Sequence, residues 1–351
     1  MKKSSSHPTL LEVARLAGVG VGTASRAVNG GVNVSAETMR KVKSAILQLG
    51  YLPNHAARVL KGGRTKTVGL LVPSISDYFF ASCAEAAGRV AKSHDSLLIV
   101  AVTMNQPGAE MSSLDVLMRH QPDGLLLVPS DPDNKELVRR IKNSAVPVVT
   151  FDRPLFDSGC SSVTTDNFDA ARNATLHLIE HGYKRILCFS SDLELYTIRE
   201  RLRGYRQAME EAGLPSLVDT CLDDMTLVSR LLAAHLKGRR SPDAVFTLKN
   251  SSTTAVVQAL HQLRISIPSR VALLGFDDLE LAATLHPSIS VVQQPIEDVG
   301  RKAAEILFNQ LERHHTIRSP GKLKRESVVL ANRLVLRRSC GCREVPVRIE
   351  L

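Results

Sequence analysis

Apolar residues follow two different patterns along this chain, and the change between them falls near residue 66. Before it, apolar positions recur every three or four residues, as on the buried face of an amphipathic helix. These positions are Leu10, Val13, Ala14, Ala17, Val42, Ala45, Ile46 and Leu49. From Thr67 onward, short β-branched runs alternate with helical patterns. The pattern therefore predicts a small helical unit followed by a larger α/β unit.

The helical unit contains signals for three helices. Thr9 and Glu12 form a capping box ahead of the first helix. A second short helix is expected over residues 23–29, and a third from Ser35 to about Leu49, with glycines at the ends of all three. Two short helices across a glycine-containing turn are typical of a helix-turn-helix, whose second helix enters the major groove of DNA.

The larger unit is predicted to contain two successive sets of strands and helices. Its strand segments are near-continuous apolar runs, as expected where helices cover both faces of a parallel sheet. The predicted strands are 68–72, 97–102, 124–128 and 146–151, then 185–189, 244–246 and 271–276, with final strands within 328–336. The predicted helices lie near 168–181, 199–212, 226–237, 252–264 and 295–313. No Gly-x-Gly-x-x-Gly, P-loop or nucleophile-elbow motif follows any strand, which argues against a dehydrogenase or a hydrolase.

Positive charge is concentrated in the helical unit. Residues 1–66 contain eleven Lys and Arg residues against two acidic ones, whereas the other 285 residues contain 34 basic and 33 acidic ones. A nucleic-acid backbone favours such segregation, because each cation placed on a phosphate releases condensed counterions. A solvated basic tail would explain the charge but not the periodic apolar positions in the same segment. Charge and periodicity together predict a folded DNA-binding unit.

Six cysteines are scattered along the chain, which is typical of reduced thiols rather than of a disulfide framework. Cys340 and Cys342 form the one close pair, but no second close pair completes four zinc ligands, and the spacing to His314 and His315 fits no zinc pattern. We therefore expect no metal. Residues 1–8 lack the apolar core of a signal peptide, and no apolar run is long enough to span a membrane, so a cytoplasmic protein is expected.

Three motifs follow one another in order through the first sixty-one residues. They are Leu-Glu-Val-Ala at 11–14, Thr-Ala-Ser-Arg-Ala-Val-Asn at 23–29 and Gly-Tyr-Leu-Pro-Asn-His-Ala-Ala-Arg-Val-Leu-Lys at 50–61. This run resembles the DNA-binding head of the LacI/GalR family of bacterial transcriptional regulators. The resemblance implies an N-terminal three-helix head, followed by a hinge helix.

In that family the hinge helix docks in the minor groove as a dimer pair and kinks the duplex. By resemblance, Leu60 is the wedge between base pairs, Ala57 is its close-contact neighbour and Asn54 is the helix cap, with Lys61 also on the DNA. The alternative for Leu60 is an ordinary buried leucine. Its surroundings are polar and basic and offer little local core to join, which favours the wedge.

The second helix departs from the family's usual pattern, because Val21 and Gly22 occupy the two readout positions at its start instead of polar side chains. Val21 can offer only methyl contact, so hydrogen-bonded readout is expected chiefly from Arg26, through a bidentate contact to guanine. The other implied DNA-binding positions are Thr23, Ser25 and Asn29. The hydroxyl side chains among them are expected to hold phosphates, which fixes register without reading sequence.

The two α/β halves resemble the periplasmic-binding-protein-like core of the same family, up to about residue 339. Open parallel sheets bind ligands beyond the carboxyl ends of their strands, and the loops there are where the family places its effector contacts. The implied effector-binding residues are Asp77, Phe79, Phe80, Asp152, Arg153, Arg201, Asn250 and Asp277. Carboxylate, amide, guanidinium and aromatic groups together suit a polyhydroxylated ligand such as a sugar.

Several of these residues also have a purely structural interpretation. The alternatives are a helix cap for Asp77, an ion pair between lobes for Asp152 with Arg153, and core packing for Phe79 and Phe80. In addition, the family's usual Asn-Asp after the sixth strand is Asn250-Ser251 here. The missing carboxylate leaves the class of ligand less certain than the fold.

The sequence therefore predicts an α/β protein with a helix-turn-helix head at 1–52, a hinge helix and linker at 53–66, a two-lobed core of parallel sheets flanked by helices at 67–339, and a tail at 340–351. The expected function is a transcriptional regulator, a homodimer on a near-palindromic operator, which needs no cofactor and responds to a small-molecule effector. The alternatives are a regulator whose core has lost sugar binding and is controlled by a protein partner or is constitutive, and a solute-binding protein, which the DNA-binding head disfavours.

Overall fold

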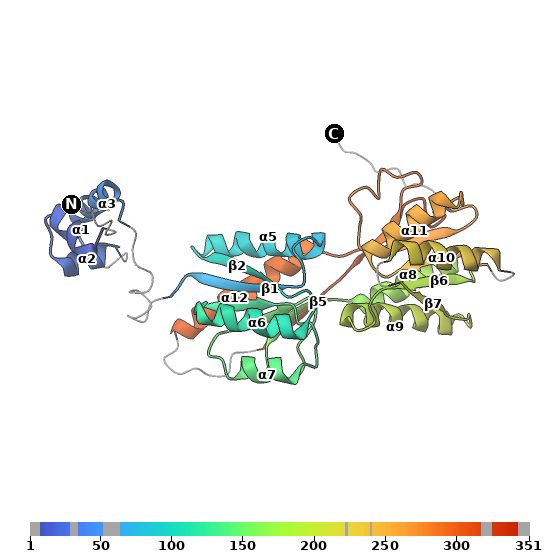
Figure 1. The fold of residues 1–351 in the computed structure, drawn as a ribbon, viewed down its shortest axis with the longest axis horizontal. Helices are drawn as coiled ribbons and strands as arrows, with labels where there is room; N and C mark the ends of the chain where they lie inside the picture. Colours follow the sequence, from blue (N-terminus) through green and yellow to red (C-terminus); the bar gives the residue numbers. More distant parts are fainter. Residues whose placement is uncertain are drawn as a thin grey trace, which may run out of the picture. The chain divides into compact units, whose positions relative to one another are not determined.

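The computed structural model describes residues 8–28, 34–51, 64–221, 224–238, 241–316 and 325–342. The chain separates into two compact units, Met1–Thr65 and Lys66–Leu351 (Figure 1). Within the described residues, no helix has the length and apolar character needed to cross a membrane.

The first unit, which we call the head, consists of three helices. They are α1 (Leu10–Leu16), α2 (Val21–Val28) and α3 (Ala36–Leu49). The predicted capping box is confirmed, since the Thr9 side chain accepts the Glu12 amide while the Glu12 carboxylate accepts the Thr9 amide. The second helix starts two residues earlier than expected, because the Gly20 carbonyl already accepts the Ala24 amide at 2.9 Å. Gly50 ends α3 with φ at +62°, a conformation that glycine adopts without strain.

The second unit contains two six-stranded sheets, each the centre of one lobe. The sheet of lobe 1 has the order β11-β5-β4-β3-β1-β2 and is parallel throughout. Its strands are β1 (Thr67–Val72), β2 (Leu97–Val102), β3 (Gly124–Leu127), β4 (Val148–Phe151), β5 (Ser161–Thr165) and β11 (Ser327–Leu330). One face packs on α5 (Tyr78–Ser93) and α12 (Ile296–Thr316), the other on α6 (Pro107–Arg119) and α7 (Lys135–Lys142) (Figure 1).

The sheet of lobe 2 has the order β12-β10-β9-β8-β6-β7, and only the pairing of β12 with β10 is antiparallel. Its strands are β6 (Ile186–Ser190), β7 (Leu217–Thr220), β8 (Ala244–Thr247), β9 (Ala272–Phe276), β10 (Ser290–Gln293) and β12 (Arg333–Val335). Its covering helices are α8 (Asn167–Glu180) and α9 (Tyr196–Glu211) on one face, and α10 (Met225–Lys237) and α11 (Asn250–Gln262) on the other. The chain passes between the lobes after β5, after β10 and after β11.

Three strands, β5, β7 and β10, were not predicted from the sequence. Each is four or five residues long and contains serine, threonine, aspartate or glutamine, so none presents a continuous apolar run. The expectation that helices cover both faces of 97–102 is confirmed only in part, since Leu98 packs against the α5 side of the sheet and Ile99 and Ala101 against the α6 side. These residues form β2 at the edge of lobe 1, where Leu97, Val100 and Val102 are exposed.

The predicted strand region 328–336 contributes one strand to each lobe, β11 to lobe 1 and β12 to lobe 2. The chain then continues into the core of lobe 2 instead of leaving it as a tail at residue 340. Cys340 is fully buried there, with Cys342 packed against the same apolar cluster.

Candidate functional site

The helix α2 divides its side chains between a buried and an exposed face. Ala24 and Ala27 are buried within the head, whereas Val21, Gly22 and Arg26 are exposed. The Arg26 side chain folds back along the helix, where its Nε donates to the Gly22 carbonyl at 3.3 Å. Arg26 therefore lies over the first turn of α2, the part of a recognition helix that contacts base edges in the major groove.

The remaining predicted DNA contacts fall into two groups. Thr23 and Ser25 are half-buried on α2, and the Thr23 hydroxyl accepts a hydrogen bond from Arg26 Nη2 at 3.4 Å. The others, Asn29, Asn54, Ala57, Leu60 and Lys61, lie outside the described residues. The hinge helix and the wedge therefore stay predictions.

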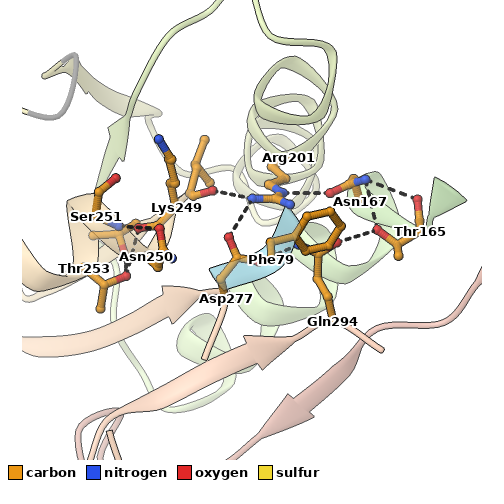
Figure 2. A network of polar contacts seen from close by, with 12 residues as sticks. Phe79, Thr165, Asn167, Arg201, Lys249, Asn250, Ser251, Thr253, Asp277 and Gln294 are labelled. Carbon is orange, nitrogen blue, oxygen red and sulfur yellow. Dashed lines mark hydrogen bonds and ion pairs between the residues drawn. The ribbon is translucent and has the colours of Figure 1, made fainter. Parts of the chain in front are cut away.

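In the core, the side chain of Arg201 on α9 is the centre of a buried polar network (Figure 2). Arg201 Nε donates to Asn167 Oδ1 at 2.7 Å, and Nη1 donates to the Leu248 carbonyl at 2.8 Å and to Asp277 Oδ2 at 3.3 Å. The guanidinium also stacks on the ring of Phe276, 3.7 Å from its centre. Because Arg201 is only 3% exposed, these contacts hold its charge in one position at the carboxyl end of the lobe 2 sheet.

Hydrogen bonds continue from this network to the crossovers between the lobes. Gln294, which follows β10, donates through Nε2 to Asp277 Oδ1 at 2.5 Å and accepts from the Thr165 hydroxyl at 3.0 Å. The Thr165 hydroxyl also accepts from Asn167 Nδ2 at 3.1 Å. Thr165 ends a strand of lobe 1 and Asn167 begins a helix of lobe 2, so the network joins the two lobes where the chain passes between them (Figure 2).

The two lobes present a matching pair of aspartates. Asp152 follows β4 of lobe 1 and Asp277 follows β9 of lobe 2, and a phenylalanine precedes each of them. Both have positive φ, +63° and +68°, and both donate their amide to the neighbouring strand, at Val163 and Val292. Positive φ is uncommon outside glycine but is several-fold enriched in aspartate and asparagine. The same left-handed backbone conformation therefore positions one carboxylate in each lobe.

On the lobe 1 side, Arg153 is 3% exposed and held in place by three acceptors. Its Nε donates to Asp152 Oδ2 at 3.2 Å, and its Nη1 donates to Asn105 Oδ1 at 2.8 Å and to the Pro129 carbonyl at 3.2 Å. The pair of Asp152 and Arg153 therefore lies within lobe 1 and does not bridge the lobes. Asp77 caps α5 by accepting the Phe79 amide at 3.0 Å, as its structural alternative predicted.

All eight predicted effector-binding residues line one cleft. Asp77, Asp152 and Asp277 supply carboxylates, and Arg153, Arg201 and Lys249 supply cations. The further lining residues are Phe79, Phe80, Asn105, Leu195, Thr197, Ile198, Asn250 and Gln294. Phe79 and Phe80 meet edge to face, with ring centres 5.1 Å apart, and also belong to the core of lobe 1. Their core interpretation and their place in the cleft are thus compatible.

Burial affects the acids of the cleft. It raises the pKa of Asp152 above its usual range, against the opposing attraction of Arg153 and Arg201. It likewise raises the pKa of Asp77, against the hydrogen bond from the Phe79 amide, and the neighbouring Asp277 carboxylate adds to the increase. The cleft therefore holds carboxylates that are poorly hydrated, and such groups gain when a ligand supplies hydrogen-bond donors.

Two families match this chain. Residues 9–54 match the family described as bacterial regulatory proteins, lacI family, and residues 65–327 match periplasmic binding proteins and the sugar binding domain of the LacI family. The chain belongs to the LacI family. This confirms the predicted helix-turn-helix head and periplasmic-binding-protein-like core, in a family of DNA-binding transcriptional regulators and not of enzymes.

Individual LacI-family proteins align over nearly the whole chain. The ribose operon repressor of Escherichia coli K12 is 31% identical over 312 residues, 86% of this chain and 93% of that protein. The transcriptional regulator CelR of Thermobifida fusca is 36% identical over 318 residues, 87% of this chain and 92% of that protein. The solved CelR–cellobiose complex matches with a TM-score of 0.69 at 30% identity, covering 95% of this chain and 99% of that one. The Lac repressor dimer bound to operator and the anti-inducer ONPF shares the fold, with a TM-score of 0.84 at 20% identity over the same fractions.

Several residues of the site were not among those predicted from the sequence. Asn105, Thr165, Asn167 and Gln294 take part in its hydrogen bonds, and Leu195, Thr197, Ile198 and Lys249 also line the cleft. Thr165 and Gln294 stand at the ends of β5 and β10, two strands that the sequence did not reveal. Asn105 follows β2, which was recognised. A polar side chain shortly beyond a strand is a signal that could have found it.

Proposed function

We propose that this LacI-family chain is an effector-controlled repressor that binds a near-palindromic operator as a homodimer, and that its effector is a sugar or sugar derivative bound in the cleft between the lobes. The observation that carries this proposal is the convergence of the eight predicted effector-binding residues on that one cleft. A cytoplasmic location follows from the proposal, since the operator is on the chromosome.

The chemistry of the cleft suits a ligand with many hydroxyl groups. Paired carboxylate oxygens accept from vicinal hydroxyls, and the Asn105 and Asn250 amides can both donate and accept. The guanidinium groups of Arg153 and Arg201 donate to hydroxyl or carboxylate oxygens, and a phenylalanine ring can cover an apolar sugar face. The cleft has three residues of each charge, which favours a neutral or zwitterionic ligand over a strongly charged one.

The position of the cleft explains how a ligand can control DNA binding. Its residues come from both lobes, and the Thr165–Gln294 hydrogen bond lies at the crossovers between them. A ligand shifts an equilibrium between lobe arrangements only by its differential affinity for them. Typical coupling free energies of about 1–3 kcal/mol would change operator affinity by about 5–150-fold, and operator DNA must change ligand affinity by the same factor.

The head supplies the contact with DNA. Arg26 is exposed over the first turn of α2, and Val21 beside it offers a methyl contact. One head reads one half-site, so specific binding calls for a pair of heads on a near-palindrome. The exposed Leu97, Val100 and Val102 at the edge of lobe 1 provide an apolar surface for pairing with a second copy.

A core that has lost its ligand is disfavoured, although Ser251 stands where the family has aspartate. The other predicted residues still line one cleft, where Arg153, Arg201 and Asp277 are held in fixed positions by hydrogen bonds. Among the relatives, the names ribose operon repressor and CelR–cellobiose complex both refer to sugars.

The test is operator binding measured by fluorescence anisotropy, with DNA flanking the chain's own gene and a panel of sugars. We expect one sugar to change affinity at least fivefold, and the same sugar to raise the melting temperature of the protein. If no member of the panel changes either quantity while DNA binding is specific, the proposed effector class is wrong. If the flanking DNA is bound no better than random DNA, the proposed operator is wrong.

A further inference from the structure

Two cysteines and two histidines from distant parts of the sequence meet at one end of lobe 2. His177 and His181 stand one turn apart at the C-terminal end of α8, and Cys340 and Cys342 follow β12. Ring nitrogens of His177 and His181 and the Cys342 sulfur all lie within 4.8 Å of one another. Cys340 Sγ lies 3.4 Å from both His177 Nε2 and Cys342 Sγ. From the sequence we expected no metal, because no second close pair was recognised beside Cys340 and Cys342; His177 lies 163 positions before Cys340.

We propose that these four side chains form a structural zinc site, with Cys340, Cys342, His177 and His181 as its tetrahedral ligands. Zinc bound by sulfur at about 2.3 Å and nitrogen at about 2.0–2.1 Å separates its ligand atoms by roughly 3.3–3.8 Å. Cys342 Sγ lies 3.5 Å from His177 Nε2 and 3.2 Å from His181 Nε2. Four of the six separations between the ligand atoms thus fall within a few tenths of an ångström of the edges of a zinc tetrahedron.

The histidine side of the cluster is prepared for a metal. His181 Nδ1 lies 3.1 Å from the His177 carbonyl, and a proton on Nδ1 donated to that oxygen leaves the Nε2 lone pair facing Cys342. Metal-binding histidines commonly make this second hydrogen bond, which fixes the tautomer and the ring. The spacing His-x-x-x-His is also one that zinc sites use. The C-terminal end of a helix carries partial negative charge, which favours a cation there.

The cysteine side is shaped by a glycine and by hydrogen bonds. Gly341 has φ at +93°, and a Cβ there would lie 2.7 Å from the Tyr183 hydroxyl, so this position requires glycine. The resulting turn brings both sulfurs toward α8. The Ser290 hydroxyl donates to Cys340 Sγ at 3.1 Å, which fixes the position of this sulfur beside His177.

The occupant is better assigned as zinc than as a hard cation. Two thiolates and two imidazoles form a soft ligand set without oxygen atoms, and magnesium and calcium require oxygen ligands. Four protein ligands leave no open position for catalysis, so the ion would be structural. It would link the segment that follows β12 to the C-terminal end of α8.

The direct test is metal content of the full-length chain, produced without a polyhistidine tag, stripped of metal under reducing conditions and then titrated with zinc alone. We expect one zinc per chain, bound with sub-micromolar Kd. Replacing zinc with cobalt should give the intense visible bands of a tetrahedral site and a thiolate-to-cobalt charge-transfer band. Absence of both signals in the reduced wild-type protein would overturn the assignment.

Variants then locate the ion. Cys342→Ser and His181→Ala should each weaken zinc binding by at least tenfold, since even outer contacts of a metal site carry tenfold to hundredfold effects. The matched controls are Cys160→Ser, also a half-buried thiol, and His261→Ala, also an exposed histidine near a helix C-terminus. The controls should bind zinc as wild type does. Equal affinity in all four variants would refute the site.

An internal disulfide is the competing state of Cys340 and Cys342. It is distinguished by counting accessible thiols in the reduced wild-type protein with and without zinc, which does not depend on any variant folding. Because Cys340 is fully buried, the thiol that zinc should protect from alkylation is that of Cys342. If reduction makes the Cys342 thiol reactive and zinc does not protect it, the cysteines are a redox pair and the zinc proposal fails.

Discussion

Replacing Arg201 with alanine tests whether the buried network holds the effector site together. The substitution removes three hydrogen bonds and the contact with the Phe276 ring. It leaves the Asp277 carboxylate, whose side chain is 15% exposed, without its cationic partner. Removing one member of a buried ion pair costs about 3–5 kcal/mol, because the remaining charge is uncompensated. We expect Arg201→Ala to destabilise the core by an amount in this range.

Arg203 provides a matched control on the same helix. Its side chain is 63% exposed and pairs with Glu200 one turn away, so Arg203→Ala should cost less than about 1 kcal/mol. Both variants are measured by urea denaturation of the full chain, following the transition of the core by circular dichroism. The same variants are tested for response to the effector, which Arg201→Ala should abolish and Arg203→Ala should retain.

A double substitution identifies the source of the loss. If the unpaired Asp277 carboxylate causes it, then Asp277→Asn should recover part of the stability in the Arg201→Ala protein, although it destabilises the wild type. The reasoning is refuted if Arg201→Ala costs no more than Arg203→Ala. It is also refuted if the two losses at Arg201 and Asp277 are simply additive.

Three further predictions concern the head, a helix contact and an acid of the cleft. Arg26→Ala should weaken operator binding by about 1–3 kcal/mol while changing binding to random DNA little, and an equal loss on both DNAs in anisotropy titrations would assign Arg26 to phosphates. Gly204→Ala should destabilise the core by about 1–3 kcal/mol or more in urea denaturation, because its Cβ would lie 2.1 Å from the Phe168 carbonyl oxygen on α8, whereas Gly88→Ala, whose Cβ would meet only a side chain at 3.9 Å, should be neutral or stabilising. Asp77→Asn should keep the cap of α5. Because burial in the folded state raises the pKa of Asp77, the stabilisation of the wild type by this group is complete below the usual pKa of 3.8 and is lost as pH rises through the higher folded pKa. The free energy of unfolding of Asp77→Asn should therefore increase relative to that of the wild type as pH rises. A wild type that becomes more stable relative to Asp77→Asn as pH rises would contradict this.

The sequence predicted the residues of the site better than the contacts that position them. Residues such as Arg201 and Asp277 could be found because the recognisable strands and helices, together with the resemblance to the LacI/GalR family, indicate where that family places its effector contacts. Thr165 and Gln294 could not, because their strands contain too many polar residues to give an apolar run. A short polar strand is stabilised by its neighbours in the sheet, and no local pattern reports those neighbours.

The cysteine–histidine cluster escaped detection for a related reason. A search along the sequence looks for metal ligands in close pairs near one another. Here the histidines are on α8 and the cysteines follow β12, and only the order of strands in lobe 2 brings the two segments together. His314 and His315 are nearer to the cysteines in sequence, but their spacing fits no zinc pattern. Proximity along the chain was a poor guide to proximity in space.

The paired aspartates at positive φ restrict how this protein can evolve. A left-handed backbone at Asp152 and Asp277 accepts aspartate, asparagine or glycine at low cost and penalises most other side chains. Mutation can therefore change these two positions only within a narrow chemical range. Neighbouring positions of the cleft with ordinary backbone and apolar side chains, such as Leu195 and Ile198, carry no such restriction. New effector preferences should arise by substitution at those freer positions, while the two aspartates persist as the fixed part of the recognition surface.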